Sequence, residues 1–442
     1  MFSIKEISIL LVLVALTLAG CQQNSNQPGN QVLPQPQANA NANSGPANAA
    51  QPTQNAAQNA GMPVTLPLID AMFTDEAFAQ AVKANVQLSD EELTKIRDAA
   101  RNSVLELSGE PSEDDARSTR ASTDKTRQEI EKIIGPERAN RFFEFVRSRW
   151  AGEGSEMATS QPNSIPTDTR VVVNAPAYRM DIFRDGKLVK TYKIGIGYPE
   201  FPLPTGLRRA NEIIFNPTWT PPDEPWVKGK VQPGKKVEAG DKLNPLGPLK
   251  IPIGLPSLVH GGKQPGRLGT FASHGCVGLT DAGVQDFARE LSSLAGSEIS
   301  AEEIKNYEKQ KTETKNVKLA QPVPIELRYE TIVVEDGKVY VYRDVYERGT
   351  NTEENLRRVL QAHGVSLESL TEQERSALIA ALEKMAVDAH GEKVTETATN
   401  TNSNKNTSGK VTRNIKGEKS VTVEIAALRG KGYPAPVNLV EK

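Results

Sequence analysis

Residues 273–279 read Ser-His-Gly-Cys-Val-Gly-Leu, and residues 259–262 upstream of them read Val-His-Gly-Gly. A free thiol is mostly protonated at neutral pH, so a nucleophilic cysteine needs a neighbouring base. Histidine is the side chain whose ordinary pKa suits that task. The chain has only four histidines, and two of them, His260 and His274, lie within sixteen residues of Cys276. The pattern predicts a reactive cysteine with two candidate bases.

The residues around the cysteine also favour this chemistry. Gly275 and Gly278 flank Cys276, where a tight backbone can turn N–H groups toward a developing oxyanion. Thr280 is a predicted helix cap, and the positive end of that helix is expected to point back toward the thiol and favour the thiolate. The predicted buried stripe of the helix is Val284, Phe287, Ala288 and Leu291.

The segment Ser273-His274-Gly275-Cys276, with His260-Gly261 sixteen residues earlier, resembles the signature of the L,D-transpeptidase family of the YkuD/ErfK type. Residues 203–206, Leu-Pro-Thr-Gly, resemble the family's Pro-Thr-Gly turn, and residues 244–247, Asn-Pro-Leu-Gly, resemble a further family segment. The resemblance covers residues 168–350. It implies a mostly β catalytic domain of packed mixed sheets that needs no metal or organic cofactor.

The resemblance also implies roles for individual residues. Cys276 is expected to attack the carbonyl of residue three in a peptidoglycan tetrapeptide stem, which releases D-alanine and leaves a thioester. His260 matches the general base, the carbonyl of Gly261 matches the group that orients its imidazole, and His274 matches a residue that supports the site. The accompanying motif and oxyanion positions are Ser273, Gly275 and Val277.

One position departs from the family pattern. Many members carry Arg or Asn two residues after the cysteine, where this chain has Gly278. A different preference for donor or acceptor is therefore expected. Three residues are candidates for a substrate groove, namely Trp219, Asn244 and Gly262, although Trp219 and Trp226 lie among prolines and loop packing explains them equally well.

Alternating apolar residues from Thr167 onward predict strands. Tyr178, Met180 and Ile182 alternate with polar neighbours, and Asp185-Gly186 predicts a hairpin turn. Further strands are predicted at residues 188–196, 213–215, 249–253, 323–329, 332–334 and 339–342. The charged residues of 302–318 are expected to form a solvated helix or loop.

Residues 63–160 predict a separate small helical domain of unknown role that is a candidate for binding a partner. Ser89 with Glu92 predicts a capping box, and Leu93, Ile96, Ala100 and Val104 follow at helical spacing. A polar interruption is expected over residues 109–124, and Gly135-Pro136 separates the last two helices. The final helix buries Phe142, Val146 and Trp150.

The N-terminal residues predict export. Residues 7–18 form an apolar run too short to span a bilayer, and Leu18-Ala19-Gly20-Cys21 resembles the lipobox of bacterial lipoproteins. Residues 1–20 are thus a predicted signal peptide, Cys21 a predicted lipid attachment site, and residues 21–62, rich in Asn, Gln, Ala and Pro, a disordered tether. Gln22 favours the outer membrane over the inner one, on its periplasmic face.

The remaining composition narrows the class of partner. Lys and Arg number 53 against 55 Asp and Glu, which argues against nucleic acid. If Cys21 carries lipid, Cys276 has no disulfide partner in the chain.

Residues 351–442 predict two short helices over 352–390, a flexible polar stretch and a last strand that contains Val421. His363 and His390 each precede a glycine, which is typical of helix ends or exposed positions.

Three functions are compatible with these residues. The first is an L,D-transpeptidase that crosslinks stems or attaches a partner to the wall. The second is an L,D-carboxypeptidase, in which water resolves the same thioester. The third is a non-catalytic lipoprotein that binds the wall, and the plainest reading of His260 and Cys276 is a core histidine with a buried thiol.

Overall fold

The computed structural model describes residues 61–107, 118–152, 161–221, 231–232, 234–388, 391, 393, 415 and 417–440. The predicted signal peptide, Cys21, all but the last two tether residues, Trp226 and His390 lie outside these ranges. All described residues belong to one compact unit, Pro52–Lys442. Within the described ranges, no helix combines the length and the apolar character that crossing a bilayer requires.

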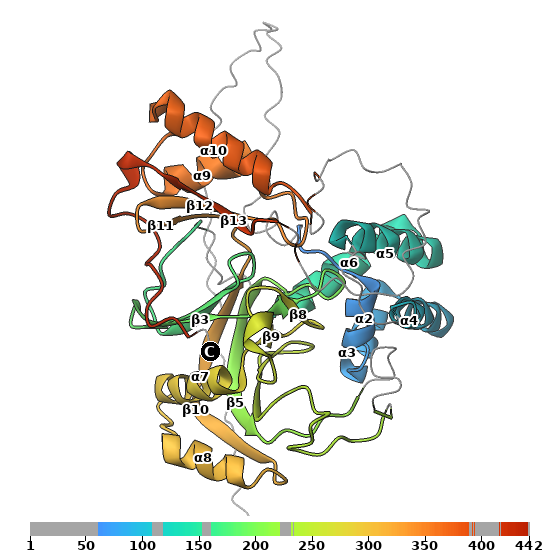
Figure 1. The fold of residues 1–442 in the computed structure, drawn as a ribbon. Coiled ribbons are helices and arrows are strands. Elements are labelled where there is room, and N and C mark those ends of the chain that lie inside the picture. Colours follow the sequence, from blue (N-terminus) through green and yellow to red (C-terminus); the bar gives the residue numbers. More distant parts are fainter. Residues whose placement is uncertain are drawn as a thin grey trace, which may run out of the picture. The chain divides into compact units, whose positions relative to one another are not determined.

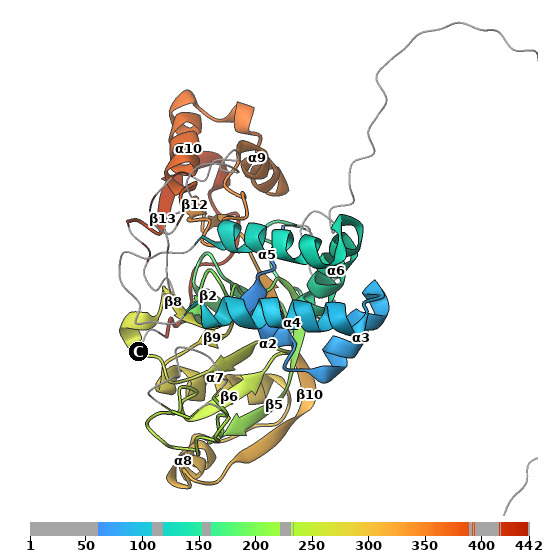
Figure 2. The ribbon, with the colours of Figure 1, turned by 90° about the vertical axis from the view of Figure 1, so that its right-hand side faces the viewer.

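The N-terminal part of the described chain is helical, as predicted (Figures 1 and 2). Its apolar faces meet in one core, whose largest members are Phe142, Phe143 and Trp150. The predicted capping box is confirmed, because Ser89 Oγ accepts from the Glu92 amide at 3.1 Å while the Glu92 carboxylate accepts from the Ser89 amide at 3.0 Å. The helices are α2 (Leu66–Met72), α3 (Glu76–Val86), α4 (Asp90–Leu105), α5 (Thr119–Ile134) and α6 (Pro136–Ala151).

The predicted interruption over residues 109–124 is too long. Helix α5 already begins at Thr119, and Ser118 Oγ caps it by accepting from the Ala121 amide at 3.1 Å. Thr119 is buried, and its hydroxyl donates to the carbonyl of Pro199 at 3.0 Å. The hydroxyl of Ser118 caps a helix and the hydroxyl of Thr119 makes a tertiary contact. The polar composition of this stretch therefore did not indicate a loop.

Strands between residues 170 and 328 form an eight-stranded mixed sheet in the order β3-β2-β1-β10-β5-β6-β7-β9. β1 pairs with β10, and β7 with β9, in parallel, and the other neighbours are antiparallel. The predicted fold class is confirmed. The strands are β1 (Arg170–Asn174), β2 (Arg179–Arg184), β3 (Lys187–Lys193), β5 (Gly206–Phe215), β6 (Leu249–Pro252), β7 (Leu258–His260), β9 (Val277–Gly278) and β10 (Lys315–Arg328).

Smaller elements accompany this sheet. β4 (Ile196–Gly197) and β8 (Phe271–Ser273) pair in parallel as a separate two-stranded sheet. Helix α7 (Asp281–Leu294) lies against the large sheet, and α8 (Ala301–Lys309) follows it with mostly exposed side chains (Figure 1). The predicted stripe of α7 is confirmed, since Val284, Phe287, Ala288 and Leu291 are all fully buried.

The hairpin between β2 and β3 turns at the predicted dipeptide. Asp185 and Gly186 have φ values of +48° and +78°, as a two-residue hairpin turn requires. Tyr178 was predicted in the strand but lies in the preceding turn with φ +51°. The polar neighbours on β2 are buried as well: Asp181 accepts from the Tyr433 hydroxyl at 3.1 Å, so the chain's C-terminal residues cover this face.

Two strands are longer than predicted. β5 begins at Gly206 rather than Ile213, and it carries the buried Arg208, whose Nη1 donates to the carbonyls of Ile253 and Gly254 at 3.1 and 2.9 Å. β10 begins at Lys315, within the stretch predicted as a solvated helix or loop, and pairs there with Phe215. Both strands were predicted too short because they contain charged residues. In β5 the charged Arg208 is buried on two carbonyls, and in β10 the first residues are largely exposed.

A second layer follows the large sheet in the chain. β11 (Ile332–Glu335), β12 (Lys338–Tyr342) and β13 (Ser420–Glu424) form an antiparallel sheet that α9 (Glu353–Ala362) and α10 (Glu372–Met385) cover (Figure 1). The predicted pair of helices and the last strand are confirmed. β11 and β12 have a core shared with these helices, separate from the core of the large sheet.

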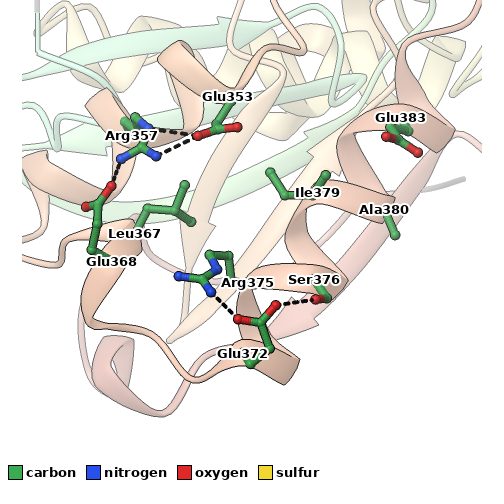
Figure 3. Close-up of a pocket in the computed structure, with 10 residues that line it drawn as sticks. All are labelled: Glu353, Arg357, Leu367, Glu368, Glu372, Arg375, Ser376, Ile379, Ala380 and Glu383. Carbon is green, nitrogen blue, oxygen red and sulfur yellow. Dashed lines mark hydrogen bonds and ion pairs between the residues drawn. The ribbon is translucent and has the colours of Figure 1, made fainter.

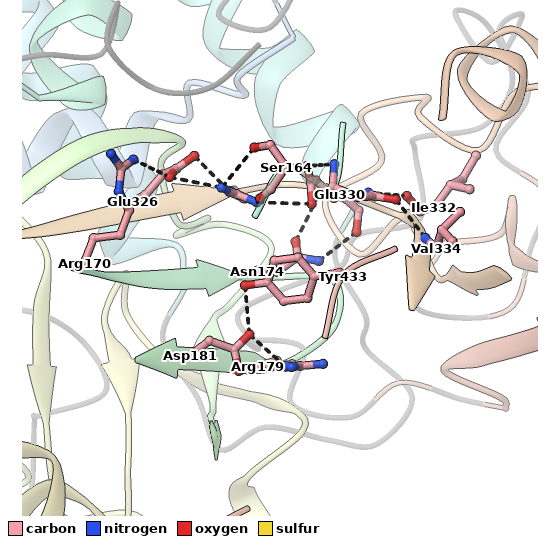
Figure 4. A network of polar contacts seen from close by, with 12 residues as sticks. Ser164, Arg170, Asn174, Arg179, Asp181, Glu326, Glu330, Ile332, Val334 and Tyr433 are labelled. Atoms are coloured by element: carbon pink, nitrogen blue, oxygen red, sulfur yellow. Dashed lines mark hydrogen bonds and ion pairs between the residues drawn. The ribbon is translucent and has the colours of Figure 1, made fainter. Parts of the chain in front are cut away.

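A buried ion pair joins the two layers, and Figure 4 shows its arginine, Arg179, beside Asp181, whose carboxylate also accepts from Tyr433. Arg179 on β2 donates to Asp181 at 2.9 Å and also to Glu335 on β11. Burial raises the pKa of Asp181, and the charge of Arg179 opposes that shift. Removing one partner of such a buried pair typically costs about 3–5 kcal/mol, so the network fixes β11 and the C-terminal residues to β2.

The C-terminal residues also extend along the edge of the large sheet. The Thr191 amide on β3 donates to the Val437 carbonyl at 2.8 Å, and the Val440 amide donates to the Thr191 carbonyl at 3.0 Å. Tyr192 forms a parallel bridge with Val440. The outermost strand β3 is therefore paired on its outer side at these positions.

Gly206 offers a test of how the helical region meets the sheet. Its φ is +134°, and an added Cβ would lie 2.3 Å from the carbonyl oxygen of Ala151, the last residue of α6. Gly206→Ala is expected to lower the free energy of unfolding by at least about 2 kcal/mol, from backbone strain and this clash. Urea titration measures the loss. Gly266→Ala, which meets nothing within 4 Å, is the matched control, and equal losses in both variants would contradict this account.

Candidate active site

The pairing of two short strands brings the histidine and the cysteine together. β7 and β9 are parallel, with Val259 opposite Val277 and His260 opposite Gly278. Residues opposite each other point to the same face, and successive residues alternate. Val259 and Val277 are fully buried on the face toward the core. His260 lies opposite Gly278, so the register brings its backbone to within two residues of Cys276, which lies in the turn just before β9.

The imidazole of His260 is held in one orientation. It is 4% exposed, and its Nδ1 lies 2.7 Å from the carbonyl oxygen of Gly261. A carbonyl oxygen can only accept, so Nδ1 carries the proton and Nε2 of the neutral ring is left as the basic nitrogen. The contact expected between Gly261 and His260 is thus present, and its catalytic role stays a prediction.

Burial and nearby cations keep this ring neutral. Burial lowers the pKa of His260 to about 3, with a further contribution from the charges of Lys263 and Lys250. Backbone hydrogen bonds with Gly261 and Leu246 oppose the shift. The ring is an unprotonated base at every pH above about 3.

Cys276 lies in a tight turn that Ser273 shapes. Ser273 Oγ accepts from the Cys276 amide at 3.0 Å and donates to the Cys276 carbonyl at 2.5 Å. The thiol is half-buried. Burial raises the pKa of Cys276, whereas the backbone of Leu258 and the charges of Lys263 and Lys250 oppose that rise. These directions favour a protonated thiol and a neutral imidazole at rest.

The backbone amides near the thiol are not equally available. The Gly278 amide donates to the Gly195 carbonyl at 2.9 Å, so the expectation that it faces an oxyanion is wrong. The Cys276 amide is bonded to Ser273. Gly275 has φ +92°, which only glycine adopts readily, and within the described chain its amide makes no hydrogen bond. Gly275 is therefore a candidate to donate to an oxyanion, and Val277 lies in β9 on the core side.

His274 is held by two aromatic rings. Tyr198 and Phe201 each meet its imidazole edge to face, with ring centroids 4.9 Å away. Such geometry places ring edges against faces and contributes about 0.5–1.5 kcal/mol per aromatic pair. The structure thus places His274 in an aromatic clamp, consistent with support of the Ser273–Cys276 turn.

The helical region holds the loop that carries this clamp. Thr65 Oγ1 donates to the Glu200 carbonyl at 2.6 Å, and Thr119 Oγ1 donates to the Pro199 carbonyl at 3.0 Å. Both threonines are fully buried. The helices α2 and α5 therefore contribute to positioning His274, which gives residues 63–160 a structural role that composition did not indicate.

Two predicted groove residues hold loops in place. The Gly262 amide donates to Asp281 Oδ1 at 2.7 Å, and a Cβ on Gly262 would lie 2.3 Å from the Pro245 carbonyl oxygen. Asn244 donates to the Pro217 carbonyl at 2.7 Å and accepts from the Leu246 amide at 3.1 Å. The glycine loop after His260 and the Asn-Pro-Leu-Gly segment are thus packed directly against each other.

Trp219 lies in the long connection between β5 and β6. Its backbone forms a bridge with Val237, with N–H to O distances of 3.0 and 2.7 Å in the two directions. The side chain is half-buried. Its place in a substrate groove stays a prediction.

Sequence reasoning missed three polar residues beside the thiol and imidazole. Lys250 on β6 lies opposite His260 and so shares its face of the sheet. Lys263 follows the His-Gly-Gly loop, and Asp281 fastens that loop. Only Lys263 had a signal in the sequence, namely its position directly after the motif.

A cavity of about 580 Å³ lies away from these residues, between α9 and α10 (Figure 3). Arg357 there pairs with Glu353 and Glu368, and Arg375 pairs with Glu372. Both arginines are thus bound to glutamates, and Glu383 adds a further acidic group to the lining. Among the described residues, no cluster of His, Cys, Asp and Glu is suited to hold a metal ion.

Comparison with known proteins identifies the segment that carries the site. Residues 168–324, about a third of the chain, match the family model YkuD, the L,D-transpeptidase catalytic domain. This segment is similar to L,D-transpeptidase catalytic domains. It contains Cys276, His260 and every motif residue discussed above.

Solved structures of L,D-transpeptidases are similar to part of the chain. The avibactam carbamoyl enzyme of Ldtfm is 16% identical (TM-score 0.23), with 36% of this chain and 49% of that one covered. The NMR structure of the E. faecium catalytic domain is 15% identical (TM-score 0.24), with 37% of this chain and 100% of that one covered. The L,D-transpeptidase from Mycobacterium smegmatis is 16% identical (TM-score 0.23), with 36% of this chain and 58% of that one covered. The chain thus spans about half the length of the first of these proteins. No curated protein matches it.

The protonation state of Cys276 can be measured through the rate at which its thiol is alkylated. In a Cys21→Ser variant Cys276 is the sole thiol, because the chain has two cysteines. Since burial raises the pKa of Cys276 above 9.0, the rate of iodoacetamide alkylation is expected to keep rising past pH 9.0. Cys276→Ala in the same background is the blank. A plateau reached below pH 7, which would mean a thiolate stabilised by imidazolium, would contradict the neutral pair.

Proposed function

We propose that the protein is a peptidoglycan L,D-transpeptidase that works through a thioester on Cys276. The observation that supports this proposal is the register of β7 and β9, which sets His260 opposite Gly278, two residues beyond Cys276, with the ring oriented by the Gly261 carbonyl. A neutral base beside a thiol is the starting arrangement for proton transfer coupled to nucleophilic attack. The match to the L,D-transpeptidase domain supports the substrate class.

The proposed reaction has two halves. In the first, His260 Nε2 takes the thiol proton as Cys276 Sγ bonds to the carbonyl carbon of residue three of the tetrapeptide stem, and the Gly275 amide donates to the oxyanion. The C–N bond then breaks, and the imidazolium returns the proton to the amine of the departing D-alanine. A thioester remains, as covalent catalysis requires.

In the second half an amine of another stem attacks the thioester. His260 takes a proton from that amine, the C–S bond breaks, and the proton returns to the sulfur. Water in place of the amine makes the protein an L,D-carboxypeptidase. Protein that binds sacculi without forming a thioester is a non-catalytic wall-binding lipoprotein.

Intact-protein mass spectrometry with a tetrapeptide donor tests the first half. The wild type is expected to gain the mass of the tripeptide acyl group, and Cys276→Ala is expected to gain nothing. His260→Gln is expected to acylate about 10²–10⁴-fold more slowly, because it lacks the base. The matched control is His363→Gln, which changes the histidine that ends α9 and is expected to acylate like the wild type.

Muropeptide products distinguish the remaining alternatives. Crosslinked dimers indicate transpeptidation, and trimmed tripeptides indicate carboxypeptidation. A wild-type protein that gains no mass while it still binds sacculi would overturn the enzyme proposal in favour of a wall-binding role.

We also propose that the protein is exported and anchored through lipid on Cys21, with the outer membrane favoured. The support is the Leu-Ala-Gly-Cys sequence at residues 18–21 behind an apolar run. Growth with labelled palmitate is expected to label the wild type and not the Cys21→Ser variant. Equal labelling of both would contradict the anchor, and fractionation of the membranes tests the sorting.

A further inference from the structure

Gly278 lies two residues after Cys276, where the resemblance led us to expect a longer side chain, and backbone conformation does not explain its glycine. Gly278 is absent from the glycines with positive φ, so its backbone accepts a side chain. An added Cβ would instead lie 2.9 Å from both Cγ and Cε of Lys263. The glycine therefore makes room for the Lys263 side chain.

The backbone fixes Lys263 over this position. Its amide donates to the Leu279 carbonyl at 3.1 Å, and the Leu279 amide donates to the His260 carbonyl at 2.9 Å. The methylene groups of Lys263 thus lie across β9 where the side chain of residue 278 would otherwise begin. That place is next to His260 in the register and two residues beyond Cys276.

The charge of Lys263 acts on both His260 and Cys276. The charge of Lys263 lowers the pKa of His260 and that of Cys276, and it precedes Lys250 among the charges that act on each. Opposite charges within roughly 4–6 Å attract strongly. A cation at this place can therefore meet a carboxylate of a peptide whose carbonyl carbon lies at the sulfur.

We propose that Lys263 is a specificity-determining residue that takes the place of a side chain at position 278 and binds a carboxylate of the acyl donor. The inference rests on the proposed function and deepens it. An ammonium on a flexible stem binds a carboxylate as a point charge. The donor is therefore selected for a free carboxylate near the attacked carbonyl.

Two carboxylates of a stem have this chemistry. One is the terminal carboxylate of the leaving D-alanine, whose Cα lies about 3.8 Å from that of residue three. The other is the side-chain carboxylate of a diaminodicarboxylic acid at residue three. Donors that lack one or the other distinguish these sources.

The experiment compares three donors by their acylation kinetics on Cys276: a tetrapeptide with both carboxylates, the same peptide ending in D-alaninamide, and one with lysine at residue three. The wild type is expected to prefer the first. Lys263→Met is expected to raise its KM about ten- to hundredfold, the effect of losing one charged hydrogen bond, and to abolish the preference over whichever donor lacks the bound carboxylate. Lys263→Arg is expected to retain the preference.

Two further variants control for packing. Lys305→Met changes an exposed lysine on α8 and is expected to behave as the wild type. In the double variant Lys263→Ala with Gly278→Arg, the space left by the lysine accepts the new side chain, and the carboxylate preference is expected to return. The melting temperature of each variant shows whether it is folded.

The outcomes separate the two proposals. No acylation of the wild type by any donor overturns the proposed function itself. A wild type that acylates while Lys263→Met keeps the same ratio of KM values overturns the role of Lys263 alone. A uniform slowing of Lys263→Met with all donors also overturns it, because packing alone then accounts for the residue.

Discussion

The parallel pairing of β7 with β9 is the constraint on which the site depends. It is only two residue pairs long, yet it sets His260 opposite Gly278, two residues beyond Cys276. Burial lowers the pKa of His260 and raises the pKa of Cys276. These directions favour a protonated thiol at rest, from which a thiolate forms when the imidazole takes the proton. Such a thiol is less exposed to oxidation than a preformed thiolate, since reactivity follows thiolate character.

Glycine and carboxylate contacts keep this short pairing in place. Asp281 at the start of α7 binds the Gly262 amide, and Gly247 leaves space for both, since a Cβ there would lie 2.5 Å from the Asp281 oxygen. The helical region acts from the other side through Thr65 and Thr119. Loops from several parts of the chain thus hold the segments that carry His260 and Cys276. A substitution far from Cys276 in the sequence can therefore shift the position of these two residues.

The sequence predicted those features that are encoded locally. The capping box at Ser89, the Asp185-Gly186 turn and the buried stripe of α7 depend on residues a few positions apart, and all three are present. It failed where long-range contacts satisfy a polar residue. Arg208 is buried on two carbonyls of another loop, so β5 was predicted too short. Lys263 was overlooked because its neighbour across the strands, Gly278, is known only from the fold.

The paired edges of the large sheet have a further consequence. Extended peptides are commonly recognised by strand addition, in which main-chain hydrogen bonds at an open edge supply affinity for any sequence. Here Val437 and Val440 already pair with Thr191 on β3, and Gly195 already pairs with Gly278 on β9. At these positions the backbone groups are already paired, so a peptide cannot add a strand there. Binding at these positions would have to come from side-chain contacts, which fits the peptide substrate proposed above.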